Sequence, residues 1–300
     1  MTQEHLGKIS FETQGSVIIG HFWAMANPCA IFIEHDDNKA VQQAIHLMAN
    51  EVWRIEQKYS RYRAGSTLDM INKSKGFAIA IDSETYHLLQ LADILWQESK
   101  GLFDISSGIF RKLWTFDKQQ SLPTQQQIDE LLTFVGWQQI KYDQQQIILP
   151  QGMQIDFGGI GKEYAADLCI ALSPNALGDS VLVNLGGDVV AKGARVDNSP
   201  WKIGIETKEG GGKVWKKIPL SKGAIATSGD VYKSILHNGK RYGHIINALT
   251  GFPVTHSPRT VTVAAPNCTE AGMLSTLAML EGENSETFLE EKGRPYWVQR

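Results

Sequence analysis

Between residues 154 and 167 the chain reads QIDFGGIGKEYAAD, so a predicted strand, a glycine-rich turn and a predicted helix follow one another directly. We expect the strand to end at Asp156 and the helix to begin near Lys162. The intervening glycines allow the backbone to approach a ligand closely. A helix N-terminus offers unpaired N–H groups and partial positive charge, and Lys162 adds a full charge, which suits phosphate. The alternative is a turn whose glycines only permit tight packing.

A second pair of glycines lies in the segment Val183-Asn184-Leu185-Gly186-Gly187-Asp188-Val189. A buried strand that runs into two glycines can bring its backbone close to a ligand or form a bulge. The alternative is a bulge and turn in which Asp188 acts as the turn acceptor.

A third segment, Thr227-Ser228-Gly229, is followed by His244 at the start of a short apolar pair. Histidine can accept a proton from a hydroxyl group near neutral pH, which makes His244 a candidate general base. A single histidine can equally be structural, and the residues alone leave both interpretations open.

A fourth segment, from Cys268 to Leu277, is expected to form an apolar helix with Thr269 as its N-cap. Ser275 and Thr276 would lie in its second turn. Hydroxyl groups there usually hydrogen-bond back to the helix or face solvent. They become metal ligands only where other oxygen atoms converge on the same point.

Apolar periodicity predicts an α+β fold in which strands dominate the second half. Asn38 is expected to cap a helix whose apolar residues recur every three to four positions from Val41 to Ile55. Further helices are expected at residues 83–99, 124–135, 162–172 and 269–280, and strands at residues 30–34, 147–149, 181–183, 201–205 and 260–263. No linker or repeat divides the chain, so we expect residues 1–300 to form a single domain, with two intertwined subdomains as the alternative.

Composition and charge exclude several classes of function. The 300 residues carry a net charge of −3, which gives no support to nucleic-acid binding or to a polybasic membrane surface. No apolar run approaches the ~20 residues of a membrane-spanning helix. The first residues show no basic segment followed by an apolar one, so we expect no signal peptide. Three widely spaced cysteines, Cys29, Cys169 and Cys268, favour a reduced, cytoplasmic protein.

Taken in this order, the segments resemble those of the ApbE-like flavin transferases, the FAD:protein FMN transferases. Earlier segments extend the resemblance from about residue 25 to about residue 280. These are Met25-Ala26-Asn27-Pro28-Cys29, Tyr59-Ser60-Arg61-Tyr62-Arg63 with Ser66 and Ile71-Asn72, and Gly101-Leu102-Phe103-Asp104-Ile105 with Trp114. The fold that the resemblance implies is a T-fold-like architecture with mixed and antiparallel sheets and packed helices.

The resemblance also implies an activity and a set of site residues. Family members bind FAD, split its pyrophosphate with Mg²⁺, and attach FMN to a threonine of an acceptor flavoprotein, releasing AMP. His244 would be the general base. The metal would be held by the Gly159 carbonyl and by side chains of the Gly272–Thr276 segment, with Ser275 and Thr276 as candidates. The residues that would contact FAD are Met25, Tyr62, Leu102, Phe103, Asp104, Asp156, Lys162 and Ile245.

Four positions depart from the family pattern. Gly272 stands where the family has a metal-binding Asp, Glu163 stands where Gly is common, and Asn247-Ala248 replaces Asp-Pro. Glu270 is close to position 272 in sequence but would point elsewhere on a helix. Because Mg²⁺ prefers anionic oxygen ligands, we expect a weakened metal site that Gly272→Asp would strengthen. Three alternatives therefore stay open: an FAD pyrophosphatase giving FMN and AMP, a flavin-binding protein without transferase activity, and an enzyme with no metal or an altered one.

Overall fold

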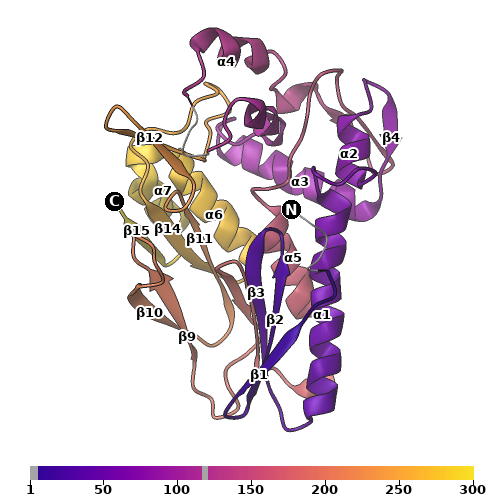
Figure 1. Cartoon of the computed structure of the whole chain (residues 1–300), viewed down its shortest axis with the longest axis vertical. Coiled ribbons are helices and arrows are strands. Elements are labelled where there is room, and N and C mark those ends of the chain that lie inside the picture. The colour runs from indigo at the N-terminus through magenta and orange to yellow at the C-terminus, as the bar shows by residue number, and fades with distance from the viewer. Residues whose placement is uncertain (1–5, 117–120) are drawn as a thin grey trace.

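The computed structural model describes residues 6–116 and 121–300, and the centre of its fold is an eight-stranded sheet (Figure 1). The strand order is β1-β2-β3-β7-β8-β11-β14-β15, and every described pair is antiparallel. The bounds are β1 Ser10–Gln14, β2 Val17–Ala24, β3 Asn27–Glu34, β7 Val181–Leu185, β8 Asp188–Ala191, β11 Gly223–Gly229, β14 Thr260–Ala265 and β15 Tyr296–Gln299. The expected α+β class is confirmed.

Three helices, α1 (Asn38–Tyr59), α5 (Gly161–Ala171) and α6 (Cys268–Leu280), cover one face of this sheet and enclose the main core. The apolar residues predicted to share one face of α1, from Val41 to Ile55, are all buried. The cap, however, is Asp37 and not Asn38, because the Asp37 carboxylate accepts a hydrogen bond from the Ala40 amide at 2.9 Å.

A two-stranded ribbon, β9 (Trp201–Glu206) and β10 (Val214–Leu220), covers the opposite face of the sheet (Figure 1, lower left). Trp201 and Ile205 of β9 and Ile218 of β10 pack against the outer residues of the central strands. A loop containing Gly210-Gly211-Gly212 joins the two strands, and all three glycines have positive φ. Both faces of the central strands are therefore buried.

The remaining elements complete the fold. They are α2 Thr67–Asn72, β4 Ala78–Ala80, α3 Ser83–Glu98, η2 Ile105–Lys112, α4 Gln125–Leu132, η3 Trp137–Gln139, β5 Lys141–Tyr142, β6 Gln146–Ile148, η4 Asn175–Leu177, β12 Ser234–His237, β13 Lys240–Gly243, η5 Gly282–Asn284 and α7 Ser285–Lys292. The helices expected at residues 83–99 and 124–135 correspond to α3 and α4. Thr124 caps α4 through a capping box.

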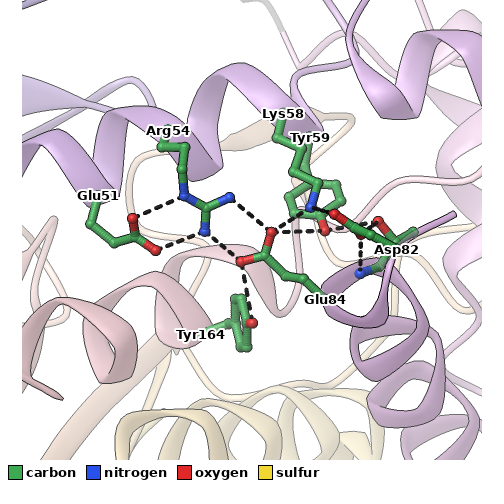
Figure 2. A network of polar contacts seen from close by, with 8 residues as sticks. Glu51, Arg54, Lys58, Tyr59, Asp82, Glu84 and Tyr164 are labelled. Atoms are coloured by element: carbon green, nitrogen blue, oxygen red, sulfur yellow. Dashed lines mark hydrogen bonds and ion pairs between the residues drawn. The ribbon is translucent and has the colours of Figure 1, made fainter. Parts of the chain in front are cut away.

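An ion-pair network joins α1, α3 and α5 (Figure 2). Glu84 of α3 lies at its centre, with Arg54 of α1 at 2.5 Å and Lys58 of α1 at 2.6 Å. The hydroxyl of Tyr164, in the first half of α5, donates to Glu84 at 3.4 Å. Because Glu84 is mostly shielded from solvent, these contacts hold the start of α5 against the two other helices.

Two further local predictions are wrong. No strand ends at Asp156, because the Asn72 side chain takes the place of a neighbouring strand and pairs with both the N–H (2.7 Å) and the C=O (3.0 Å) of Ile155. The N-cap of α6 is Asn267 and not Thr269, since the Asn267 side chain accepts from the Glu270 amide at 2.8 Å. Among the described helices, none has the length and apolar character to cross a membrane.

Candidate functional site

The carboxylate of Asp156 holds the glycine-rich turn before α5 and forms ion pairs with two arginines. Asp156 lies 2.8 Å from Arg61 and 3.2 Å from Arg111, and its other oxygen accepts from the Gly158 amide at 2.8 Å. Arg111 retains a half-exposed side chain. The predicted turn therefore exists, and two guanidinium groups add to its positive charge.

Lys162, in the first turn of α5, brings this turn together with the second glycine segment. Its ammonium pairs with the buried carboxylate of Asp188, whose other oxygen accepts from the Thr227 amide at 3.2 Å. Burial alone would lower the pKa of Lys162, but the Asp188 and Glu163 carboxylates outweigh burial and raise that pKa. Asp188 is thus an ion-pair partner and not the turn acceptor. The side chain of Asn184 has that role and accepts a hydrogen bond from the Gly187 amide at 2.8 Å.

Position 272 is filled by a carboxylate from the facing helix. A Cβ placed on Gly272 of α6 would lie 2.3 Å from Cγ and 3.1 Å from Oε1 of Glu163 of α5. Glu163 is buried, and burial raises the pKa of its carboxyl to about 7. The departure at position 272 is therefore accompanied by a carboxylate from a second helix.

Three hydroxyl groups meet where α6 packs on β11. Ser228 Oγ lies 2.8 Å from Ser275 Oγ and 2.9 Å from Thr276 Oγ1. The Ser275 hydroxyl is fully buried and also donates to the Gly272 carbonyl at 3.0 Å. Ser275 is therefore engaged in helix packing, whereas Thr276 is partly exposed and hydrogen-bonded only to Ser228 among the described residues.

His244 follows β13, where its backbone N–H donates to the Lys233 carbonyl at 3.1 Å. Its ring lies edge-on to Phe116, and its Nδ1 is buried without a hydrogen-bond partner in the described part of the chain. Burial, helped by the positive charges of Lys233 and Arg111, lowers the pKa of His244 to about 4. The imidazole is therefore neutral at pH 7 and has a nitrogen free to accept a proton.

Four of the predicted flavin contacts contact other residues of the described chain. They are Leu102, Phe103, Asp104 and Ile245. Asp104 is buried and caps η2, accepting from Ser106 N, Ser106 Oγ and Trp137 N at 2.7–2.8 Å. The ring of Phe103 lies against Gly159, where it would be 2.8 Å from an added Cβ. The Leu102 carbonyl accepts from the Ala248 amide at 3.1 Å, and Ile245 packs against the core.

The two other predicted flavin contacts, Tyr62 and Met25, differ in exposure. Tyr62 is 82% exposed, and the Arg61 guanidinium lies over its ring. Met25 forms the hairpin turn between β2 and β3, and its amide donates to Glu56 of α1 at 2.8 Å.

Three cations were missed as site residues. Arg61 and Arg111 lie within or beside segments that carry the resemblance, so their positive charge was a usable signal. Lys233 belongs to no motif. Although the residue as a whole is exposed, burial of its amino group, together with Arg111 and Lys162, lowers the pKa of Lys233. It makes no side-chain hydrogen bond or ion pair with residues 6–116 or 121–300.

No group of three or more His, Cys, Asp or Glu side chains in the described ranges could hold a metal ion by itself. A metal at this site would thus depend on hydroxyl and carbonyl oxygens, or on oxygens of the ligand, in addition to a carboxylate.

The fold and site define an α+β protein with a cationic, glycine-rich turn at the N-terminus of a helix beside a neutral histidine. The model of the ApbE family matches residues 25–296, and the chain belongs to that family. It is 30% identical over 251 residues to the FAD:protein FMN transferase of Haemophilus influenzae, covering 79% of this chain and 72% of the relative. The corresponding protein of Treponema pallidum is also 30% identical, over 272 residues that cover 82% and 75% of the two chains.

Solved structures agree with this assignment. The ApbE protein of Thermotoga maritima superposes with a TM-score of 0.84 at 25% identity and covers 97% of this chain and 94% of its own. The flavinyl transferase ApbE of Pseudomonas stutzeri, in its apo form, superposes with a TM-score of 0.82 at 25% identity and covers 98% and 92%. The likeness extends over nearly the whole chain.

Proposed function

We propose that this chain is an FAD:protein FMN transferase, which moves FMN from FAD to a threonine of an acceptor flavoprotein and releases AMP. The observation that carries the proposal is the position of His244. It is neutral, its Nδ1 has no partner within the described residues, and it lies in the field of Lys233, Arg111 and Lys162. The free nitrogen can accept the proton of an attacking hydroxyl group, and the surrounding cations suit the negative charge of a phosphate ester.

The cations supply the binding energy for the pyrophosphate of FAD. Arg111 and Lys233 interact electrostatically with one another, and both can donate to phosphate oxygens. The N-terminus of α5 adds its partial positive charge. Lys162 is already paired with Asp188, so part of its charge serves to hold the site together. We propose further flavin contacts from the predicted set, namely Met25, Tyr62, Leu102, Phe103, Asp104, Asp156 and Ile245.

The reaction is a phosphoryl transfer in which His244 handles the proton. The imidazole takes the proton of the acceptor threonine as its oxygen bonds to the flavin-side phosphorus. The bond between that phosphorus and the bridging oxygen breaks, and AMP leaves with this oxygen. General-base catalysis of this kind contributes a factor of about 10² to 10⁴ in rate.

We also propose that Mg²⁺ binds beside the turn. The residues fit the ion, because a buried carboxylate oxygen of Glu163 has no hydrogen-bond partner among the residues that the structure describes. Of the predicted ligands, the Gly159 carbonyl and the Thr276 hydroxyl remain candidates, whereas the Ser275 hydroxyl is taken up by Gly272 and Ser228. Mg²⁺ neutralises charge on pyrophosphate oxygens when it is bound.

Incubation of the purified protein with FAD, Mg²⁺ and a threonine-containing acceptor tests the proposal. We expect equal amounts of AMP and of acceptor that has gained the mass of FMN. Free FMN with unmodified acceptor would indicate a pyrophosphatase, and FAD binding without AMP would indicate a binding protein. His244→Ala should reduce transfer by about 10²-fold or more while FAD still binds.

A reducing compartment, such as the cytoplasm, is our proposal for the location. Cys29, Cys169 and Cys268 are all buried, and none forms a disulfide. Cell fractionation with a specific antibody would test this.

A further inference from the structure

One carboxylate oxygen at the contact between α5 and α6 is buried without a partner. Glu163 is 6% exposed, and its Oε2 receives no hydrogen bond from the described residues. Its other oxygen, Oε1, lies 3.6 Å from Nζ of Lys162, whose closer partner is Asp188. A buried carboxylate oxygen that lacks a donor or cation is unfavourable. A cation bound at this oxygen would remove the penalty.

The charges around Glu163 favour a cation as well. Glu163 and Asp188 are both buried, and the ammonium of Lys162 is the cation that contacts them. With both carboxylates ionised, this group of three carries one net negative charge. A divalent ion compensates that charge and still leaves positive charge for an anionic ligand.

Hard oxygen donors lie on the adjoining segments. Thr276 follows Gly272 by one helical turn and so lies on the same face of α6. Gly159 precedes α5, and its carbonyl accepts no backbone hydrogen bond from residues 6–116 and 121–300. Carboxylate, hydroxyl and carbonyl oxygens form the donor set that Mg²⁺ prefers.

We propose that Glu163 of α5 supplies the carboxylate that binds Mg²⁺ in this chain, with the Thr276 hydroxyl and the Gly159 carbonyl. The carboxylate that the family pattern places at position 272 of α6 is thus supplied here by residue 163 of α5. Because a side chain at position 272 would overlap Cγ of Glu163, the two departures from the family pattern, Glu163 and Gly272, form a single compensated change. This inference rests on the proposed function only in assigning the ion to the same site.

Direct binding of Mn²⁺, followed by the loss of its free EPR signal, tests the inference without measuring transfer. Mn²⁺ takes the same oxygen ligands as Mg²⁺. Titrations are made with and without FAD, for the natural protein, Glu163→Gln, Glu163→Gly and the double variant Glu163→Gly with Gly272→Asp. Glu270→Gln is the matched control, because Glu270 lies on α6 but pairs with Arg294 at 2.7 Å.

We expect both single changes at Glu163 to weaken Mn²⁺ binding by at least ~10-fold. The double variant should recover most of the affinity, since Asp at position 272 then enters the space that Glu163 has left. Glu270→Gln should bind as the natural protein does. Glu163→Gln keeps the shape of the side chain, so it decides the question if the other variants do not fold.

Undiminished binding by Glu163→Gln, or no binding by the natural protein with or without FAD, would overturn the assignment. Flavin fluorescence measures FAD affinity separately. If FAD binds and FMN is transferred but Mn²⁺ binding does not depend on Glu163, the inference fails and the proposed function stands. If FAD does not bind, the proposed function fails, and the titration without FAD still tests Glu163.

Discussion

The carboxylate of Asp167, in α5, caps the start of α6 by accepting hydrogen bonds from the backbone amide of Thr269 at 2.8 Å and from its hydroxyl at 2.6 Å. The second carboxylate oxygen accepts from the Cys268 amide at 2.7 Å. One turn earlier in α5, Glu163 meets Gly272, which lies one turn later in α6. The two helices therefore run antiparallel, and Asp167 sets the register that brings Glu163 to position 272.

Asp167→Ala should lower the free energy of unfolding by about 2 kcal/mol, because it removes charge-assisted bonds to helix amides that have no intrahelical partner. It should also weaken Mn²⁺ binding if the register of α5 and α6 shifts. Urea denaturation and the Mn²⁺ titration measure the two effects. Glu291→Ala, at an exposed position, is the control and should change stability by less than about 0.5 kcal/mol.

Gly272→Ala should destabilise the protein by about 1–3 kcal/mol, although alanine is the better helix former, because the new methyl group overlaps Cγ of Glu163. In the Glu163→Gly background the same substitution should become stabilising. Gly161→Ala, a helical position with open space around it, should be neutral or stabilising. Additive effects at positions 163 and 272 in urea denaturation would contradict the overlap.

Ala26→Gly should stabilise the protein by about 1 kcal/mol. Ala26 lies in the turn between β2 and β3 with φ +61°, a region that disfavours residues with a Cβ. Gly15, in the neighbouring turn between β1 and β2, has φ +63° and no atom near a Cβ, so Gly15→Ala should destabilise by a similar amount. Thermal unfolding of both variants measures the two effects. A change of the melting temperature in the same direction for both variants would argue against backbone strain.

Lys233→Gln should weaken FAD binding by about 10-fold, because it removes one charge-assisted contact with phosphate. Riboflavin, which has no phosphate, should bind the variant and the natural protein equally. The FAD effect should shrink at high salt. Flavin fluorescence titrations measure both ligands, with Lys39→Gln on the exposed start of α1 as the control. An equal loss for riboflavin would place Lys233 against the flavin ring instead.

His244 should make stability depend on pH between about 6.5 and 4. Its pKa is about 4 in the folded protein, against about 6.5 for an unfolded chain, so the unfolded state takes up the proton first. The protein should therefore lose stability as the pH falls below 6.5, by about 2 kcal/mol at pH 5 from this residue. Urea denaturation of the natural protein and of His244→Gln at pH 8 and pH 5 isolates this contribution. If the two proteins differ in free energy of unfolding by the same amount at both pH values, His244 does not cause the pH dependence.

Local pattern was enough to predict five of the seven α-helices in the described residues, but α2 and α7 were not predicted. Val41, Ile45 and Met48 recur at helical spacing, and all three are fully buried on one face of α1. The exact cap was not predictable, because Asp37 and Asn38 are both good capping residues and the backbone geometry selects between them. A strand was predicted to end at Asp156. Ile155 is hydrogen-bonded as a strand residue would be, but its partner is the side chain of Asn72 and not a neighbouring strand.

The candidate site was predictable only in part. The glycine-rich turn, Lys162 and His244 lie in short segments whose composition indicates chemistry. Lys233 lies in no such segment and joins the site because its amino group approaches Arg111 and Lys162 in the folded chain. No local pattern could have indicated it.

Sequence by itself determined the α+β class, the positions of five helices and the segments that carry the chemistry, because helix periodicity, glycine turns and charged residues act over a few neighbouring positions. Tertiary structure alone decided which residues stand together. Considered separately in the sequence, Gly272 is a lost carboxylate and Glu163 is an unusual glutamate. In the fold, the packing of α5 against α6 places the Glu163 side chain in the space beside Gly272, because two side chains cannot occupy one volume in a closely packed core.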